Sequence, residues 1–304
     1  MGIKSKSCVA FVFWVLKHKH QNKNQNRDTK NKMFTKHIKT DQQNKCHLNV
    51  INPFRCVVWQ ICQFLYQPIH MNFIKQYLTL EHNSGSCVVS ISIHSILPLL
   101  AAGLFNSRVV IYNLTTYPPT IQYELKTHTN SVCFVAFHPH HPLLATCSRD
   151  CTAIIYNMST SPPTIQQHLK YHTDCVAFVT FHPSVPLLAT CSWDNTIILY
   201  DLTTVPATIK DHLKNHYLVF DPQNVFTVSF HPQLLILVGG GHWDYSIILY
   251  NISMSSPTTK HHLKHHTQMV LCTAFHPNRP LFVTGSCDTT VALYNMSTIP
   301  LQSS

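Results

Sequence analysis

The sequence lacks the local signatures on which an enzyme assignment usually rests. It has no glycine-rich phosphate loop, no nucleophile elbow and no paired carboxylates in a repeated pocket. Cysteine occurs 12 times but never as a CxxC pair, so free, buried thiols in a reducing compartment are a better interpretation than a disulfide framework or a zinc site. We therefore expect a non-catalytic protein without a cofactor, located inside the cell in the cytoplasm or the nucleus.

Charged residues are scarce, and they are distributed unevenly. They make up 11% of the chain, against 45% hydrophobic residues, which is ample for a buried core. Residues 1–45 hold ten Lys and one Arg against Asp28 and Asp41, a net charge of +9 out of the total of +10. We therefore predict a basic, low-complexity and largely disordered segment at 1–45 and a folded domain at 46–304. Such a tail suits salt-sensitive contacts with nucleic acid, although its polar bias also fits plain disorder.

Long apolar runs and metal-ligand spacings are missing as well. The apolar stretch at residues 8–16 has nine residues, too few to span a bilayer, and we expect no membrane partner. The chain has 23 His, with a dense cluster at 261–266, but no Cys or carboxylate stands at ligand spacing beside that cluster. Surface histidines explain the cluster better than a metal site, and we predict no bound metal.

A long internal repeat dominates the rest of the sequence. The phrase FHPHHPLLATCSRDCTAIIYN begins at Phe137 and returns in recognisable form at Phe181, Phe230 and Phe275, with a weaker copy at Ile93. The tyrosines that close the copies are spaced by 44, 44, 50 and 44 residues. They are Tyr112, Tyr156, Tyr200, Tyr250 and Tyr294. A fixed period of this length is the signature of a repeat architecture.

Each copy divides into short strands. In the best copy, residues 175–181 form an apolar, β-prone stretch that ends at Pro183, because proline cannot donate to a sheet ladder. Residues 187–191, 196–200 and 208–214 are three further strands, and a tight turn lies at Asp194 and Asn195. Four strands in about 44 residues make one blade of a β-propeller. We predict an all-β propeller of four-stranded antiparallel blades, with five clear repeats.

The N-terminal region holds fainter echoes of the same phrase, and it bears on how the ring closes. Residues 8–12 read CVAFV, identical to residues 175–179, which favours a decayed sixth blade. The last copy ends at Tyr294 with little chain after it, so residues 73–80 are an alternative source for its fourth strand. Both closures stay open at this point.

The repeat resembles that of WD-repeat β-propellers over residues 82–304. Tyr stands where the family has Trp, Asn usually replaces the final Asp, and the Gly before the repeat His is absent. In the family, a His, a Ser, an Asp and the closing aromatic form a hydrogen-bonded network within a blade. The resemblance assigns these roles to His128, His172, His216 and His266, to Ser148, Ser192 and Ser286, to Asp150, Asp194, Asp244 and Asp288, and to Tyr156, Tyr200, Tyr250 and Tyr294.

One position varies where packing would favour uniformity. The residue before the turn Asp is Arg149, Trp193 or Trp243, and Phe105 holds the matching place in the weak copy. The resemblance puts this position on the narrower face of the ring, and Trp and Arg are the side chains that dominate binding hot spots. We expect a protein-interaction scaffold that binds partners there. Packing against the neighbouring blade is the alternative role for these side chains, and a nucleic-acid-associated factor using the basic tail is the alternative function.

Overall fold

The computed structural model describes residues 80, 85–214, 224–241, 245–253 and 257–298. The chain divides into two units, Met1–Phe54 and Arg55–Ser304, and all of the described residues lie in the second. The predicted basic segment and the proposed sixth blade therefore lie outside the described residues, as does all but the last residue of the proposed closing strand at 73–80. The same is true of three expected site residues, His216, Trp243 and Asp244.

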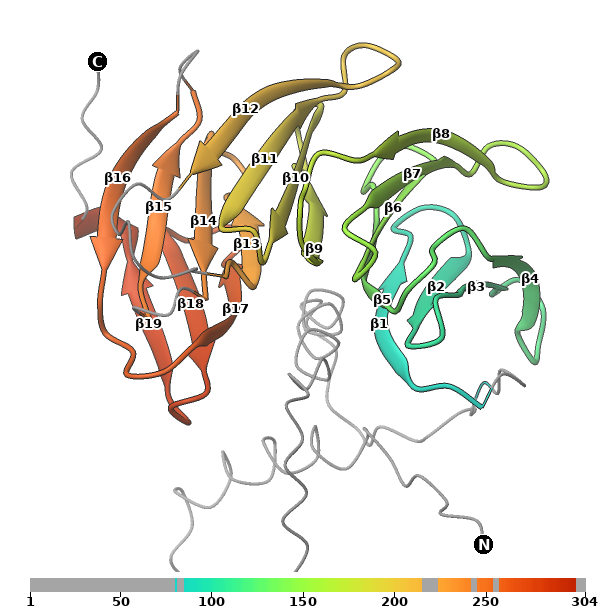
Figure 1. Ribbon diagram of the computed structural model, residues 1–304, viewed down its shortest axis with the longest axis horizontal. Coiled ribbons are helices and arrows are strands. Elements are labelled where there is room, and N and C mark those ends of the chain that lie inside the picture. Colours follow the sequence, from blue (N-terminus) through green and yellow to red (C-terminus); the bar gives the residue numbers. More distant parts are fainter. Residues whose placement is uncertain (1–79, 81–84, 215–223, 242–244, 254–256, 299–304) are drawn as a thin grey trace, which may run out of the picture. The chain divides into compact units, whose positions relative to one another are not determined.

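The described chain forms antiparallel sheets whose strands follow one another in sequence (Figure 1). The first sheet comprises β1 (Val88–Ile93), β2 (Leu99–Leu104), β3 (Val109–Asn113) and β4 (Thr120–Leu125). The second comprises β5 (Val132–Phe137), β6 (Leu143–Ser148), β7 (Ala153–Asn157) and β8 (Thr164–Leu169). The third comprises β9 (Val176–Phe181), β10 (Leu187–Ser192), β11 (Thr196–Asp201) and β12 (Thr208–Lys214).

The last two sheets continue the pattern. The fourth comprises β13 (Thr227–Phe230), β14 (Ile236–Gly240), β15 (Ile247–Asn251) and β16 (Thr258–Leu263). The fifth comprises β17 (Val270–Phe275), β18 (Leu281–Ser286) and β19 (Val291–Asn295), followed by the 3-10 turn η2 (Met296–Thr298). The predicted all-β fold is confirmed, and the four strands expected in the third copy match β9 to β12 within one residue at each end.

The turn between the second and third strands of each sheet has the same backbone conformation. The residue after the turn Asp, or after its counterpart, has a φ between 61° and 72°, in the left-handed region that non-glycine residues seldom enter. These residues are Ser107, Cys151, Asn195, Tyr245 and Thr289. Tyr245 is bulky and Thr289 is β-branched, so at these two positions the local sequence does not favour the conformation, and the surrounding contacts must hold it.

The sheets pack against one another in chain order through their first strands. β5 contacts β1, β9 contacts β5, β13 contacts β9, and β17 contacts β13. The apolar clusters lie between consecutive sheets: one is shared by the first and second, the largest by the second, third and fourth, and another by the fourth and fifth. Central strands such as β10 are buried along their whole length, which is why they are apolar on both faces. This stacking is that of consecutive propeller blades.

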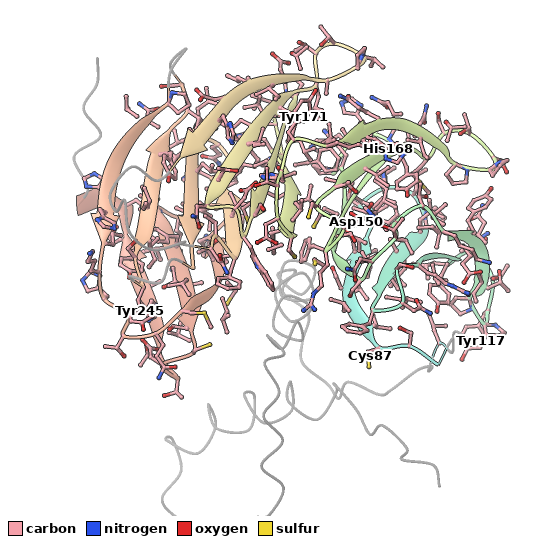
Figure 2. The ribbon with its side chains drawn as sticks, viewed as in Figure 1. Cys87, Tyr117, Asp150, His168, Tyr171 and Tyr245 are labelled. Carbon is pink, nitrogen blue, oxygen red and sulfur yellow. The ribbon has the colours of Figure 1, made fainter. Side chains whose placement is uncertain are left out.

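The outer strands of the sheets, and the loops beside them, are more exposed than the first and second strands. Tyr117, in the loop between β3 and β4, is 80% exposed and projects from the first sheet (Figure 2). In the fifth sheet the third strand, β19, is the last one described, and its Val291 and Leu293 are 75% and 65% exposed. Their counterparts Ile197 and Leu199 in the third sheet are buried, because a fourth strand and a following sheet cover them.

Candidate functional site

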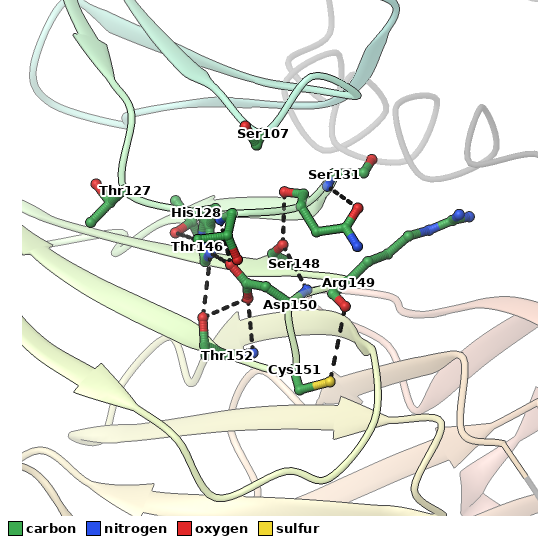
Figure 3. A network of polar contacts seen from close by, with 12 residues as sticks. Ser107, Thr127, His128, Ser131, Thr146, Ser148, Arg149, Asp150, Cys151 and Thr152 are labelled. Atoms are coloured by element: carbon green, nitrogen blue, oxygen red, sulfur yellow. Dashed lines mark hydrogen bonds and ion pairs between the residues drawn. The ribbon is translucent and has the colours of Figure 1, made fainter.

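A buried polar network occupies the turn end of the second sheet (Figure 3). Asp150 follows β6 in the tight turn, and its Oδ2 lies 2.8 Å from His128 Nδ1. His128 Nε2 lies 2.8 Å from Thr146 Oγ1, in the middle of β6. The backbone N–H of Thr129 also donates to Asp150 Oδ2, and the Thr152 N–H and hydroxyl donate to Oδ1. One carboxylate therefore ties the segment before β5 to the β6–β7 turn.

The chemistry of the carboxylate settles the direction of these hydrogen bonds. Burial opposes ionisation of Asp150, but hydrogen bonds from His128 and Thr152 outweigh it and hold the pKa of this carboxyl well below its usual range. An ionised carboxylate can only accept, so His128 Nδ1 must carry the proton. In the neutral ring Nε2 is then the acceptor, and the Thr146 hydroxyl donates to it. Whenever the ring is neutral, the network therefore selects the tautomer with the proton on Nδ1.

The same arrangement recurs twice with almost unchanged geometry. In the third sheet His172 contacts Asp194 at 2.9 Å and Thr190 at 2.8 Å. In the fifth sheet the corresponding distances are 2.9 Å from His266 to Asp288 and 2.7 Å from His266 to Thr284. Hydrogen bonds similarly hold the pKa of Asp194 and Asp288 far below the usual range of an aspartate, against the opposing effect of burial.

The serines expected in this network contact the backbone of the turn rather than the histidine. Ser148 Oγ donates to the Asn130 carbonyl and accepts the backbone N–H of Asp150, and it is Thr146 that contacts the histidine. Ser192 and Ser286 make the matching pair of bonds in their own sheets. These serines thus link the turn after the second strand of each sheet to the segment that precedes the first strand. The histidine partners missed in the sequence are Thr146, Thr190 and Thr284, each recurring within an apolar strand.

The closing tyrosines differ from sheet to sheet. Tyr156 Oη donates to Thr127 Oγ1 at 2.8 Å, and burial raises the pKa of this phenol while the Thr127 and Thr146 hydroxyls oppose the rise. Tyr200 is fully buried, and its hydroxyl has no hydrogen-bond partner of normal geometry among the described residues; burial raises the pKa of this phenol, and the nearby Thr190 hydroxyl opposes the rise. Burial also raises the pKa of Tyr250. The hydroxyl of Tyr294 lies 3.4 Å from His265 Nδ1. Tyrosine thus serves mainly as a packing residue.

A second set of histidines, which we call the hairpin histidines, lies where the first strand of each sheet turns into the second. Each ring accepts two backbone N–H groups of the following loop at Nδ1, over 3.0–3.2 Å. They are His94, His138, His182, His231 and His276. The first four also contact a phenylalanine of the next sheet, with ring centroids 4.9–5.3 Å apart. The same histidine ring therefore holds the loop of its own sheet and packs against the next sheet.

The variable position before the turn forms a continuous row of side chains. The Arg149 guanidinium lies 5.8 Å from the Phe105 ring centroid and 5.7 Å from that of Trp193. Trp193 in turn meets Phe226 edge-on at 5.8 Å. We call Phe105, Arg149, Trp193 and Phe226 the cation-aromatic row, and they come from four consecutive sheets or the segments that enter them. Phe226 was not expected from the sequence.

Exposure differs along the cation-aromatic row. Phe105 is 48% exposed, whereas Arg149 and Trp193 are half-buried and Phe226 is buried. Trp193 Nε1 is buried and has no hydrogen-bond acceptor among the described residues. The Phe105 and Arg149 end of the row is therefore the accessible one, while Trp193 also packs against the neighbouring sheet, as the alternative interpretation of this position required.

Two other features of the described residues bear on chemistry. Within the described ranges, no three His, Cys, Asp or Glu side chains are grouped as metal ligands would be. Over the same ranges, no helix has the length and apolar character needed to cross a bilayer.

Comparison with known proteins identifies the repeat. The family profile described as "WD domain, G-beta repeat" (WD40) matches residues 119–157, 163–201 and 257–295. Each matched segment combines the outer strand of one sheet with three strands of the next, and these segments carry the three His–Asp–Thr networks. A search of curated proteins found no match.

Among solved structures, a chain in the crystal structure of the mitotic checkpoint complex shares this fold. The TM-score is 0.60 at 18% sequence identity, and the match covers 68% of the present chain. The chain spans 63% of the length of that neighbour. At this identity the likeness concerns the fold, which is that of a propeller built from WD repeats.

Proposed function

The chain belongs to the WD40-repeat family, and on that premise we propose that it is a non-catalytic scaffold that binds other proteins through the cation-aromatic row. A WD40 propeller offers a stiff disc with varied surface residues, which suits the assembly of partners. An intracellular location, cytoplasmic or nuclear, goes with this proposal, because the free thiols are suited to a reducing compartment.

The observation that carries the proposal is the position of Arg149 between two aromatic rings. The cation lies within 5.8 Å of Phe105 and 5.7 Å of Trp193, near the distance at which an aromatic face attracts a cation. Such contacts hold a long side chain in one place and lower the entropy lost when a partner binds. Arg149 has no salt bridge to a carboxylate among the described residues, so it can still pair with one. The row therefore suits a protein partner that presents an acidic group beside an apolar side chain.

The test compares two exposed apolar residues of the first sheet region. Phe105 is 48% exposed in the row, and Ile121 is 49% exposed on the outer strand β4. We expect Phe105→Ser and Arg149→Gln to reduce partner capture on the order of thirtyfold, as for hot-spot residues. Ile121→Ser should leave it unchanged. Capture is measured by quantitative mass spectrometry on the tagged full chain, with melting temperatures recorded in parallel.

Each outcome of that comparison decides something. Loss of the same partners in Phe105→Ser and Arg149→Gln, at an unchanged melting temperature, supports the row as the binding surface. Equal capture by all three variants contradicts it. A strong fall in melting temperature with Arg149→Gln would mean that the row serves packing between sheets.

The basic N-terminal segment supports a second candidate function, association with nucleic acid. Its net charge of +9 within residues 1–45 suits sequence-independent phosphate contacts that weaken with salt. The test is a fluorescence-anisotropy titration with duplex DNA over a salt series, comparing the full chain with residues 46–304. A steep salt slope that vanishes on truncation would favour this function, and equal slopes would dismiss it.

A further inference from the structure

We propose that Cys133 and Cys175 form a reversible disulfide that links the second and third sheets when a hydroperoxide oxidises the protein. Their sulfur atoms lie 3.6 Å apart, 42 positions apart in the sequence. A disulfide requires about 2.05 Å, so side-chain rotation and a small adjustment of two adjoining strands close the gap. The strands concerned, β5 and β9, are already in contact.

The position of Cys133 explains why one of the thiols is accessible. The register between β5 and β6 shifts between Val132 and Phe134, which leaves Cys133 as the extra residue of a β-bulge. Its side chain is half-buried, whereas Cys175, directly before β9, is 4% exposed. Contact with Cys133 and burial together raise the pKa of Cys175. Cys133 is therefore the thiol that meets a solution oxidant first, and Cys175 is the thiol that resolves it.

Equivalent positions at the other sheet contacts carry residues that cannot make this bond. The bulge residue corresponding to Cys133 is Val89 in the first sheet and Ala177 in the third. The counterpart of Cys175 at the entrance to β5 is Ser131. Repeat packing accounts for an apolar or small side chain at these places, but it does not account for two cysteines whose sulfur atoms touch. The pair is thus specific to the contact between the second and third sheets.

The chemistry balances in two steps. Cys133 attacks the hydroperoxide, the O–O bond breaks, and the products are a Cys133 sulfenic acid and an alcohol, or water when the oxidant is hydrogen peroxide. The Cys175 sulfur then attacks the Cys133 sulfur, the S–O bond breaks, and water leaves with the Cys175 proton. Two thiols are oxidised, one hydroperoxide is reduced, and an external thiol reverses the reaction.

Backbone hydrogen bonds connect both cysteine segments to residues of the cation-aromatic row. The Cys175 carbonyl accepts the backbone N–H of Trp193 at 3.0 Å, and the carbonyl of Ser131, two residues before Cys133, accepts that of Arg149 at 3.0 Å. Linking the two segments would therefore fix the spacing between Arg149 and Trp193. The disulfide itself does not depend on the proposed binding function.

The experiment uses the reduced full chain treated with hydrogen peroxide. Remaining thiols are alkylated, the protein is digested without reductant, and linked peptides are identified by mass spectrometry. We expect a Cys133–Cys175 peptide that dithiothreitol abolishes. We also expect a rise in melting temperature on the order of 5–10 °C, because the bond closes a long loop of the unfolded chain.

Two variants and one control make the test decisive. Cys133→Ser should abolish the linked peptide and the rise in melting temperature, and Cys175→Ala should do the same if the first variant folds poorly. Cys151→Ser, another half-buried cysteine of the same repeat, should preserve both effects. Absence of the linked peptide in the oxidised wild type, dominance of a different cysteine pair, or a rise that persists in Cys133→Ser would overturn the proposal.

Discussion

Replacing Asp194 by alanine should be among the most damaging single changes in the third sheet. Its carboxylate accepts hydrogen bonds from His172 Nδ1, the Thr173 N–H, and both the N–H and the hydroxyl of Thr196, over 2.6–3.0 Å. The Asp194 side chain is 8% exposed. Hydrogen bonds to a charged group contribute about 1.5–3 kcal/mol each, but bonds to one carboxylate do not add. We therefore expect a loss of about 3–5 kcal/mol in the free energy of unfolding.

The conformation of the turn depends on the same carboxylate. Asn195, directly after Asp194, has a φ of 72°, and the bonds to Thr196 hold that conformation in place. Without the carboxylate, the Thr196 N–H loses its acceptor, His172 Nδ1 keeps only the Thr196 hydroxyl at 3.2 Å, and the turn can relax. For a domain of this size the expected fall in melting temperature is on the order of 10 °C.

The assay is urea unfolding followed by far-UV circular dichroism, alongside calorimetric melting. Asp201→Ala is the matched control, because Asp201 lies in the same sheet and its carboxylate accepts only from Thr203 among the described residues. That control should change the free energy of unfolding by less than about 1 kcal/mol. The reasoning is wrong if Asp194→Ala and Asp201→Ala melt within about 2 °C of each other.

Other perturbations address the rest of the framework. Burial lowers the pKa of four hairpin histidines below the ordinary histidine value of about 6.5, and it lowers that of His138 to about 4. As the pH falls, these histidines are therefore protonated in the unfolded chain before they are protonated in the folded one. The free energy of unfolding should therefore fall between pH 6.5 and 4, and His138→Asn, which keeps an acceptor for the loop, should flatten that slope in a pH series of urea unfolding curves. Thr190→Val leaves His172 Nε2 without its partner and should cost about 1–3 kcal/mol by the same assay, whereas Thr190→Ser should cost less. Gly103→Ala places a methyl group 2.8 Å from Val132 Cγ1 between two sheets and should lower the melting temperature through about 1–3 kcal/mol of overpacking, a result that a neutral variant would contradict.

The strands could be predicted from the sequence because each one is bounded by a strong local signal. The Pro after the first strand and the Asp turn after the second recur in every well-formed copy, and β9 to β12 follow them closely. The residue type at the Asp turn also indicated a structural role for Asp150, and the carboxylate lies at the centre of a network. Local backbone chemistry was sufficient for these features.

The choice between serine and threonine was beyond the sequence for a geometric reason. Thr146 and Ser148 are two residues apart on β6 and so share one face of the sheet, where either hydroxyl is chemically able to meet a histidine. The register between the strands and the path of the segment before β5 decide that the ring reaches Thr146. The resemblance placed the serine in the network but did not say which hydroxyl meets the histidine, and the coordinates assign that contact to Thr146.

In the cation-aromatic row, too, some residues can be identified from the sequence and one can be identified only from the three-dimensional packing. Its three residues at the position before the turn were evident from the repeat, but Phe226 belongs to the entrance of β13, in a copy whose spacing departs from 44 residues. Only the packing of the third sheet on the fourth brings its ring against Trp193. Side chains contributed by the irregular part of a repeat need three-dimensional coordinates to be found.

The stacking of sheets in chain order makes this molecule nearly one-dimensional in energetic terms. Each sheet shares its apolar cluster with the sheets before and after it in the sequence, so stability is close to a sum of single-sheet contributions and nearest-neighbour interfaces. Damage in the first sheet and damage in the fifth should therefore add in free energy, whereas two changes at one shared interface should not. Substitutions can therefore change one interface at a time, and one repeat can acquire new surface residues while the packing of the other repeats stays the same.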